Sequence, residues 1–212
     1  MDGLKPIETF YRGYRFRSRL EARWAIFFDE LNIAYEYEPE GYTYQSGECY
    51  LPDFYLPKFK CFFEIKPNYT DDFEREFLFN KYFNFGIETV MKTDNVYVIA
   101  FGDPTEALPV FGSDDCDFLR MNAYCFFQNW NTEYGYSVER VFAIFPDNKK
   151  LLLFTEERAR NDCIVTFNVD DYRDKKFRLD SARRDLTLVC RAQRKARYAR
   201  FERLRGGIEC QR

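Results

Sequence analysis

The sequence predicts an α/β fold in which helices cover a mixed central sheet. Three stretches carry this prediction: an amphipathic helix over 19–31, an aromatic-rich β-hairpin over 50–66 and a continuous apolar strand over 95–101. A second helical pattern, over 71–85, lies between the hairpin and that strand. With a strand over 33–37, the order through residue 101 becomes helix, three strands, helix, strand.

The composition limits the kind of protein. A chain of 212 residues that is 46% apolar can bury a full core, as one large domain or as a core domain with an appended piece. No stretch approaches the roughly 18 uncharged apolar residues of a membrane span. The N-terminus also lacks an apolar signal-peptide core, so we expect an intracellular protein with no membrane partner.

Two residue types narrow the possible chemistry. The seven cysteines include no C-x-x-C pair, which predicts reduced thiols and argues against a zinc ribbon or an iron–sulfur cluster. The chain has no histidine, which excludes Ser-His-Asp and Cys-His catalysis and histidine-containing zinc sites. Acid–base or metal chemistry would therefore depend on carboxylates, lysine, tyrosine or water.

The first helix has a clear start and a clear end. Ser18 and Glu21 match the S-x-x-E capping box directly before an apolar run. Asn32 can adopt the left-handed conformation that ends a helix. Between these ends apolar residues recur at helical spacing, namely Leu20, Trp24, Phe27, Phe28 and Leu31. Three aromatic residues around the helix start are expected in the core: Tyr14, Phe16 and Trp24.

The hairpin has two aromatic-rich strands, over 50–56 and 61–66, with a turn at 57–60. If the turn is centred there, Leu56 pairs with Cys61, and stepping back along both strands fixes every other pair. The segment before the hairpin is expected to form a turn and then a hairpin arm or loop, over 39–41 and 42–48.

This register brings three charged groups together. Asp53 lies opposite Glu64, with Cβ atoms about 5 Å apart, and like charges at that separation are destabilising. Strand alternation places Lys66 on the same face as Glu64, about 7 Å further on. A divalent cation would relieve the repulsion between the carboxylates, because Mg²⁺ takes one or two carboxylates and leaves its other positions to water and phosphate.

The second half of the chain has weaker patterns. Residues 103–117 are loop-like, 124–130 could be strand or helix, and short strands are expected over 138–145, 150–154 and 164–169. We therefore divide the chain into a core domain over 1–110 and a C-terminal extension over 111–212. The extension is expected to be rich in strands and to end in a basic helix over 183–205.

The charge is distributed unevenly along the chain. Residues 183–205 carry nine Arg and Lys against two acidic residues, a net +7, which leaves about −10 for the rest of a chain whose total is −3. A basic segment on an acidic body suggests a polyanion partner. Alternatively, the segment is a surface helix that pairs with the acidic body. Its candidate contacts are Arg191, Arg194, Lys195, Arg197 and Arg200.

Several of these residues occur in a pattern found in a known superfamily. Glu21 on the first helix, Pro52-Asp53 at a strand and Glu64-Ile65-Lys66 on the next strand resemble the PD-(D/E)XK nucleases. A SRLEARWA-like helix, a YEPEG-like turn and a YLPDFYLP-like strand are together similar to a phage- and bacterial-type branch, and KARYARFE (195–202) resembles a segment near the end of such proteins. The resemblance is good over 14–101 and weak over 102–182.

The resemblance implies a restriction-endonuclease-like αβββαβ core and a role for each residue. Asp53 and Glu64 would bind Mg²⁺ or Mn²⁺, with the Ile65 carbonyl as a third ligand. Lys66 would position the attacking water or help to deprotonate it, and Glu21 would bind the metal directly or through water. Phosphodiester hydrolysis needs an activated water and charge neutralisation, which metal ions supply. A partly desolvated lysine beside a metal would have a lowered pKa.

Simpler explanations exist for parts of this pattern. Glu21 could merely satisfy the backbone N–H of Ser18 within the capping box, or do so in addition to binding metal. The same D/E-x-K spacing occurs at Asp147-Asn-Lys149 and Asp174-Lys-Lys176, which we assign to solvated loops. Four arginines around the helix start could contact phosphates or simply be solvated: Arg15, Arg17, Arg19 and Arg23.

The sequence thus predicts a metal-dependent endonuclease that hydrolyses phosphodiester bonds in DNA. An RNA endonuclease of the same fold is the alternative within the enzyme class. A catalytically silent nucleic-acid-binding or scaffold protein is the alternative outside it. The enzyme could nick as a monomer, cut both strands as a homodimer, or act with a partner subunit.

Overall fold

The computed structural model describes ten segments of the chain: 6–44, 47–68, 72–93, 95–107, 119–128, 133–147, 150–155, 165–167, 179–204 and 207–210. Its helices are α1 (Arg19–Glu30), α2 (Asp72–Thr93), α4 (Leu179–Tyr198) and the 3₁₀ turn η1 (Pro57–Phe59). Its strands are β1 (Thr9–Tyr11), β2 (Tyr14–Phe16), β3 (Glu36–Tyr37), β4 (Tyr42–Thr43), β5 (Cys49–Tyr50), β6 (Phe54–Leu56), β7 (Cys61–Lys66), β8 (Val96–Ala107), β9 (Leu119–Gln128), β10 (Tyr136–Asp147), β11 (Lys150–Thr155), β12 (Val165–Phe167), β13 (Phe201–Leu204) and β14 (Gly207–Cys210).

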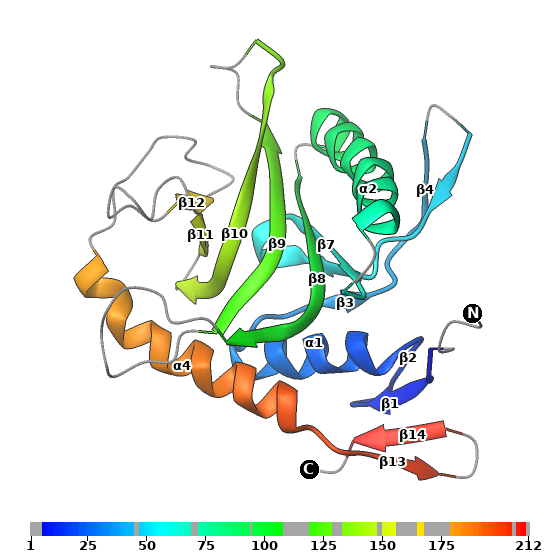
Figure 1. Cartoon of the computed structure of the whole chain (residues 1–212), viewed down its shortest axis with the longest axis vertical. Coiled ribbons are helices and arrows are strands. Elements are labelled where there is room, and N and C mark those ends of the chain that lie inside the picture. Colours follow the sequence, from blue (N-terminus) through cyan, green and yellow to red (C-terminus); the bar gives the residue numbers. More distant parts are fainter. Residues whose placement is uncertain are drawn as a thin grey trace.

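The main layer is a mixed eight-stranded sheet in the order β12-β11-β10-β9-β8-β7-β6-β3 (Figure 1). Strands β7 and β8 run parallel, and the other neighbouring pairs run antiparallel. A second sheet has the order β13-β14-β1-β2, and β4 pairs with β5. The predicted α/β fold with a mixed sheet is therefore confirmed.

Helices pack on both faces of the main sheet. Figure 1 shows α1 and α4 side by side below the sheet, whereas α2 lies at the upper right of the view. Along β8, Val98 and Ala100 belong to the α1/α4 core, whereas Tyr97 and Ile99 belong to the α2 core. Because the first half of β8 is buried on both faces, its sequence over 96–101 is apolar without alternation. The two predicted parts of the chain share this sheet, since β8 pairs with β9.

Helix α1 forms as the sequence predicts. The Ser18 hydroxyl accepts the backbone N–H of Glu21 at 3.1 Å, which caps the helix start. Asn32 has a left-handed φ of 53° directly after the helix. Phe16 and Trp24 are buried in the core as expected, whereas Tyr14 is 38% exposed. Tyr14 contacts Phe16 from the edge of the core, so its predicted burial is wrong.

Several element boundaries differ from the predicted ones. The strand expected over 50–56 is interrupted between β5 and β6, where Pro52 has no N–H to donate to a ladder. The helix expected over 71–85 continues to Thr93, because Gly86 leaves room for the Tyr97 and Phe126 rings and does not end the helix. The strand expected over 33–37 is shorter, because β3 contains only Glu36–Tyr37. The segment 124–130, expected as strand or helix, is strand as far as the end of β9 at Gln128.

The basic helix is also shorter than predicted. Helix α4 ends at Tyr198, and Arg200 lies between it and β13. Strand β13 returns the chain to the sheet that contains β1 and β2. Of the other D/E-x-K copies, Asp147 is the last residue of β10, whereas positions 148–149 and 174–176 lie outside the described residues.

The described part of the chain shows the state of its cysteines and the length and polarity of its helices. The four cysteines described there, Cys49, Cys61, Cys125 and Cys190, carry free thiols. Within the same part, every helix is too short or too polar to cross a membrane.

Candidate active site

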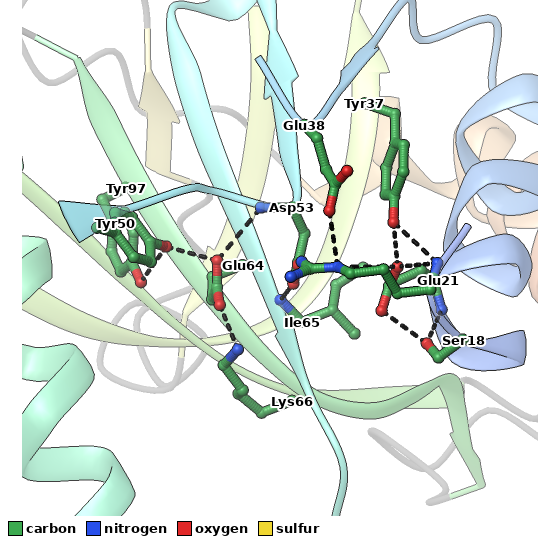
Figure 2. A network of polar contacts seen from close by, with 11 residues as sticks. Ser18, Glu21, Tyr37, Glu38, Tyr50, Asp53, Glu64, Ile65, Lys66 and Tyr97 are labelled. Atoms are coloured by element: carbon green, nitrogen blue, oxygen red, sulfur yellow. Dashed lines mark hydrogen bonds and ion pairs between the residues drawn. The ribbon is translucent and has the colours of Figure 1, made fainter. Parts of the chain in front are cut away.

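The candidate site lies where the β6–β7 hairpin opens. Leu56 pairs with Cys61 and Phe54 with Phe63, so the predicted register is confirmed. Asp53 directly precedes β6, and its backbone N–H lies 3.3 Å from Oε2 of Glu64. Both carboxylates are only 2% exposed. The hairpin thus places two buried acids side by side (Figure 2).

Asp53 is held through both of its carboxylate oxygens. Oδ2 accepts the Ile65 N–H at 2.7 Å, and Oδ1 accepts Nη2 of Arg17 at 2.5 Å. The Ile65 N–H is available because β6 pairs with β7 only as far as Phe63. In a strand the N–H and C=O of one residue face the same neighbour. The Ile65 carbonyl therefore faces the Asp53 side, as a metal ligand would.

The surroundings of Asp53 disfavour its charge. Burial and the neighbouring Glu64 carboxylate raise the pKa of Asp53 well above its usual value, against the effects of Lys66 and the Ile65 N–H. Two adjacent carboxylates that share a buried site cannot both ionise without a compensating cation. Arg17 beside Asp53 and Lys66 beside Glu64 supply part of that positive charge in this structure, and a divalent cation would supply more.

Glu64 is fixed by a pair of buried phenols. Its Oε2 accepts the Tyr50 hydroxyl at 2.5 Å, and that hydroxyl lies 3.0 Å from the hydroxyl of Tyr97 (Figure 2). Burial raises the pKa of both phenols well above the usual value, so they remain protonated. Sequence reasoning missed this pair. The available signal was a tyrosine inside a buried aromatic run, because a buried phenol needs a hydrogen-bond partner.

Lys66 completes the predicted constellation. Its ammonium forms an ion pair with Oε1 of Glu64 and lies 4.4 Å from the centre of the Tyr82 ring. Burial opposes its charge, but Glu64 and Asp53 outweigh burial and raise the Lys66 pKa. The lowered pKa is expected for a lysine beside a bound metal, and for that state it stays a prediction. Lys66 is a cationic hydrogen-bond donor here.

Glu21 lies next to these residues but is engaged differently. Its Oε2 accepts the Tyr37 hydroxyl at 2.5 Å and the Arg17 N–H at 3.0 Å, and its Oε1 accepts the Ser18 hydroxyl at 2.8 Å. The capping interaction thus goes to the N–H of Arg17, whereas Ser18 N–H was the predicted partner. Oε2 is shared by the Tyr37 hydroxyl and the Arg17 N–H, and that N–H also lies 3.0 Å from the Tyr37 hydroxyl oxygen.

The donor set fits a small hard cation. Within the described segments no cluster of three or more Asp, Glu, His or Cys side chains is arranged for metal binding. The acids that the hairpin itself brings together are two, Asp53 and Glu64, and the Ile65 N–H bound to Asp53 places the Ile65 carbonyl on the same side. Mg²⁺ commonly binds through one or two carboxylates and keeps several waters, so this set suits it. Mn²⁺ favours the same oxygen ligands.

The four arginines near the helix start have separate environments. Arg17 contacts Asp53 and also Glu38, at 2.7 Å. Arg15 forms an exposed ion pair with Glu8. Arg23 binds both carboxylate oxygens of Asp103, and Arg19 is exposed at the start of α1. Arg17 is thus the arginine that the structure brings into the site.

Helix α4 presents its basic side chains to solvent. Val189, Ala192 and Ala196 are buried against the α1 side of the core. The five predicted contact residues are all exposed: Arg191, Arg194, Lys195, Arg197 and Arg200. Lys195 forms an ion pair with Glu30 of α1 at 2.5 Å, which is the predicted pairing with the acidic body.

Comparison with known proteins gives no independent assignment. Models of protein families, curated proteins and solved structures were each compared with this chain, and none matches it.

Proposed function

We propose that this protein is a metal-dependent endonuclease that hydrolyses phosphodiester bonds in DNA. The single observation that carries the proposal is the pair of buried carboxylates, Asp53 and Glu64, each paired with a cationic side chain. Burying two acids side by side costs stability. Such an arrangement is typical of a functional site.

The arrangement of elements supports a restriction-endonuclease-like core. Helix α1 is followed by β3, β6 and β7, which are antiparallel, and then by α2 and β8. Strand β8 runs parallel to β7. Apart from the short β4–β5 pair, this order is compatible with the αβββαβ core that the sequence resemblance implies, with the candidate residues at the point where β6 and β7 separate.

Each residue has a proposed role. Asp53, Glu64 and the Ile65 carbonyl would hold Mg²⁺ or Mn²⁺, and the bound ion would supply charge neutralisation and an acidified water. Lys66, which is protonated, would donate a hydrogen bond to a phosphate oxygen and keep the attacking water in place. Glu21 is fixed by Tyr37 and Ser18 and would hold a water at the edge of the site.

The test is a cleavage assay on supercoiled plasmid with Mg²⁺, Mn²⁺ or chelator. We expect metal-dependent nicking or linearisation by the unaltered protein and a loss of at least about 100-fold in Lys66→Ala, the size expected when a charge-stabilising group is removed. Lys92→Ala in the last turn of α2, which removes an exposed ammonium paired with Glu88, is the matched control and should cleave normally.

Two alternatives are separate arms of the same assay. Matched RNA in place of the plasmid identifies an RNA endonuclease if only RNA is cut. Binding without cleavage of either substrate in any metal, by folded protein, would contradict the enzyme proposal and favour a nucleic-acid-binding scaffold. Normal cleavage by Lys66→Ala would also contradict the proposed site.

A further inference from the structure

Arg17 joins the carboxylates around the candidate site. Its Nη2 lies 2.5 Å from Oδ1 of Asp53, its Nε lies 2.7 Å from Glu38, and the same Nε lies 4.0 Å from Glu21. Figure 2 shows these three acids surrounding one region between β6 and α1. One guanidinium therefore neutralises a cluster of negative charge.

The contact uses the oxygen that a cation would need. Oδ2 of Asp53 is held by the Ile65 N–H, so Oδ1 is the oxygen that faces outward to Arg17. A divalent cation on Oδ1 would stand next to the guanidinium, and the two positive charges would repel each other. Arg17 and a divalent cation therefore compete for Asp53.

Arg17 is built so that its side chain can leave while its backbone stays. The backbone N–H is held by Oε2 of Glu21 and by the Tyr37 hydroxyl, each at 3.0 Å. The side chain, in contrast, is 53% exposed, whereas that of Asp53 is 2% exposed. Rotation of the side chain alone can carry the guanidinium from a buried carboxylate to solvent.

A guanidinium released beside the site could bind a backbone phosphate of a nucleic acid. Arginine binds phosphate through two parallel hydrogen bonds, and it does so better than lysine because its donors form a rigid fork. A nucleic acid placed for cleavage would bring its backbone phosphates to this position. The phosphate would then replace Asp53 and Glu38 as the acceptor.

We propose that Arg17 couples divalent-cation binding at Asp53 to nucleic-acid binding, by exchanging Asp53 for a backbone phosphate. This inference rests on the proposed metal site. Binding free energies are reciprocal, so the nucleic acid raises the cation affinity by the same factor by which the cation raises the affinity for nucleic acid. The protein would load its metal most readily on its substrate.

The test measures Mn²⁺ affinity by isothermal titration calorimetry, without any reading of cleavage. Arg17→Ala and Arg17→Gln are compared with the unaltered chain and with Arg15→Ala, a matched control whose ion pair with Glu8 lies outside the site. Without nucleic acid, we expect both Arg17 variants to bind Mn²⁺ about tenfold more tightly, a typical coupling factor. Arg15→Ala should bind as the unaltered chain does.

The same titrations with a short DNA duplex measure the coupling itself. They are carried out on chains that also carry Lys66→Ala, so that the duplex stays intact. The duplex should raise Mn²⁺ affinity about tenfold when Arg17 is present and should have no effect when it is replaced. An equal effect of the duplex with and without Arg17 would overturn the coupling.

The outcome also distinguishes this inference from the proposed function. If the unaltered chain binds Mn²⁺ and Asp53→Ala does not, the metal site stands, and unchanged affinity in both Arg17 variants refutes only the coupling. If no variant binds Mn²⁺, the metal site itself is refuted, and the coupling with it. Circular dichroism of each variant checks that the fold is kept.

Discussion

The orientation of the Glu64 carboxylate depends on one buried hydroxyl. Tyr50 donates to Oε2 of Glu64, and removing this donor leaves a buried charged oxygen with only the 3.3 Å contact from Asp53 N–H. We expect Tyr50→Phe to lower the free energy of unfolding by about 1.5–3 kcal/mol, the usual worth of a hydrogen bond to a charged group. Urea unfolding measures this difference.

A second tyrosine in the same cluster provides the control. The Tyr44 hydroxyl contacts the hydroxyl of Thr89 at 3.0 Å, so both partners are neutral. Tyr44→Phe should therefore cost only about 0.5–1.5 kcal/mol. Equal losses in the two variants would show that the charge on Glu64 does not contribute to the Tyr50 interaction.

The raised pKa of Asp53 makes a prediction about pH. The folded protein holds the Asp53 proton more tightly than the unfolded chain, whose aspartate pKa is about 3.9. Stability from this group is therefore complete at low pH and is lost as pH rises from about 4 through the raised pKa, with a slope of up to about 1.4 kcal/mol per pH unit. In Asp53→Asn the side chain at this position does not titrate, so this pH-dependent loss of stability should be absent.

The measurement is the free energy of unfolding of both proteins by urea, from pH 4 to pH 8. Carboxylates far from Asp53 contribute equally to both proteins and cancel in the difference, whereas Glu64 and Glu21 interact with Asp53, so their response is part of the measured effect. We expect Asp53→Asn to gain stability relative to the unaltered chain as pH rises. A difference that does not change with pH would contradict the assigned environment of Asp53.

At the scale of the elements, α2 depends on a glycine in its interior. A Cβ added at Gly86 would lie 2.8 Å from the Tyr97 ring and 2.9 Å from the Phe126 ring. Alanine normally gains about 1 kcal/mol over glycine in a helix. Overpacking costs about 1–3 kcal/mol, and here two buried rings would have to move. We expect Gly86→Ala to destabilise the protein in thermal unfolding.

The exposed neighbour of Gly86 separates helix propensity from packing. Asn84 lies on the exposed side of α2, so Asn84→Ala should keep all core contacts and stabilise the protein slightly, by about 0.5 kcal/mol. If Gly86→Ala stabilised the protein as Asn84→Ala does, α2 would not pack closely on β8 and β9.

The hairpin could be predicted from sequence because local rules determine it. A four-residue break between two aromatic runs sets the pairing of Leu56 with Cys61, and strand alternation then places Asp53 next to Glu64 and Lys66. The end of the strand at Pro52 follows the same logic, because proline cannot donate to a ladder.

Other parts of the site depend on residues far apart in the chain. The Arg17–Asp53 contact joins positions 36 residues apart, and the Tyr50–Tyr97 contact joins positions 47 residues apart. Both require the finished packing of strands and helices, which periodicity does not encode. The role of Gly86 could not be predicted from the sequence for the same reason. It depends on the contact of α2 with Tyr97 of β8 and Phe126 of β9 and is independent of helix propensity.

At the scale of the whole molecule, the charge is separated between an acidic body and one basic helix. Helix α4 buries Val189 and Ala192 and exposes Arg191, Arg194 and Arg197. Each arginine that neutralises a DNA phosphate releases counterions, which changes the slope of log K against log salt by about 0.9. In a chain with net charge −3, a segment that concentrates positive charge would favour binding to a polyanion such as DNA.

We expect Arg194→Ala/Arg197→Ala to reduce the salt slope of DNA binding by about 1.8. Fluorescence anisotropy with a labelled duplex at several salt concentrations, in chelator, gives the slope. The control is Lys58→Ala/Lys60→Asn, which removes the same charge from exposed positions at the turn of the β6–β7 hairpin and suits the left-handed φ of residue 60. Equal slopes for the two double variants would mean that α4 acts through total charge alone, and a slope reduced only in the α4 variant would place the DNA backbone along this helix.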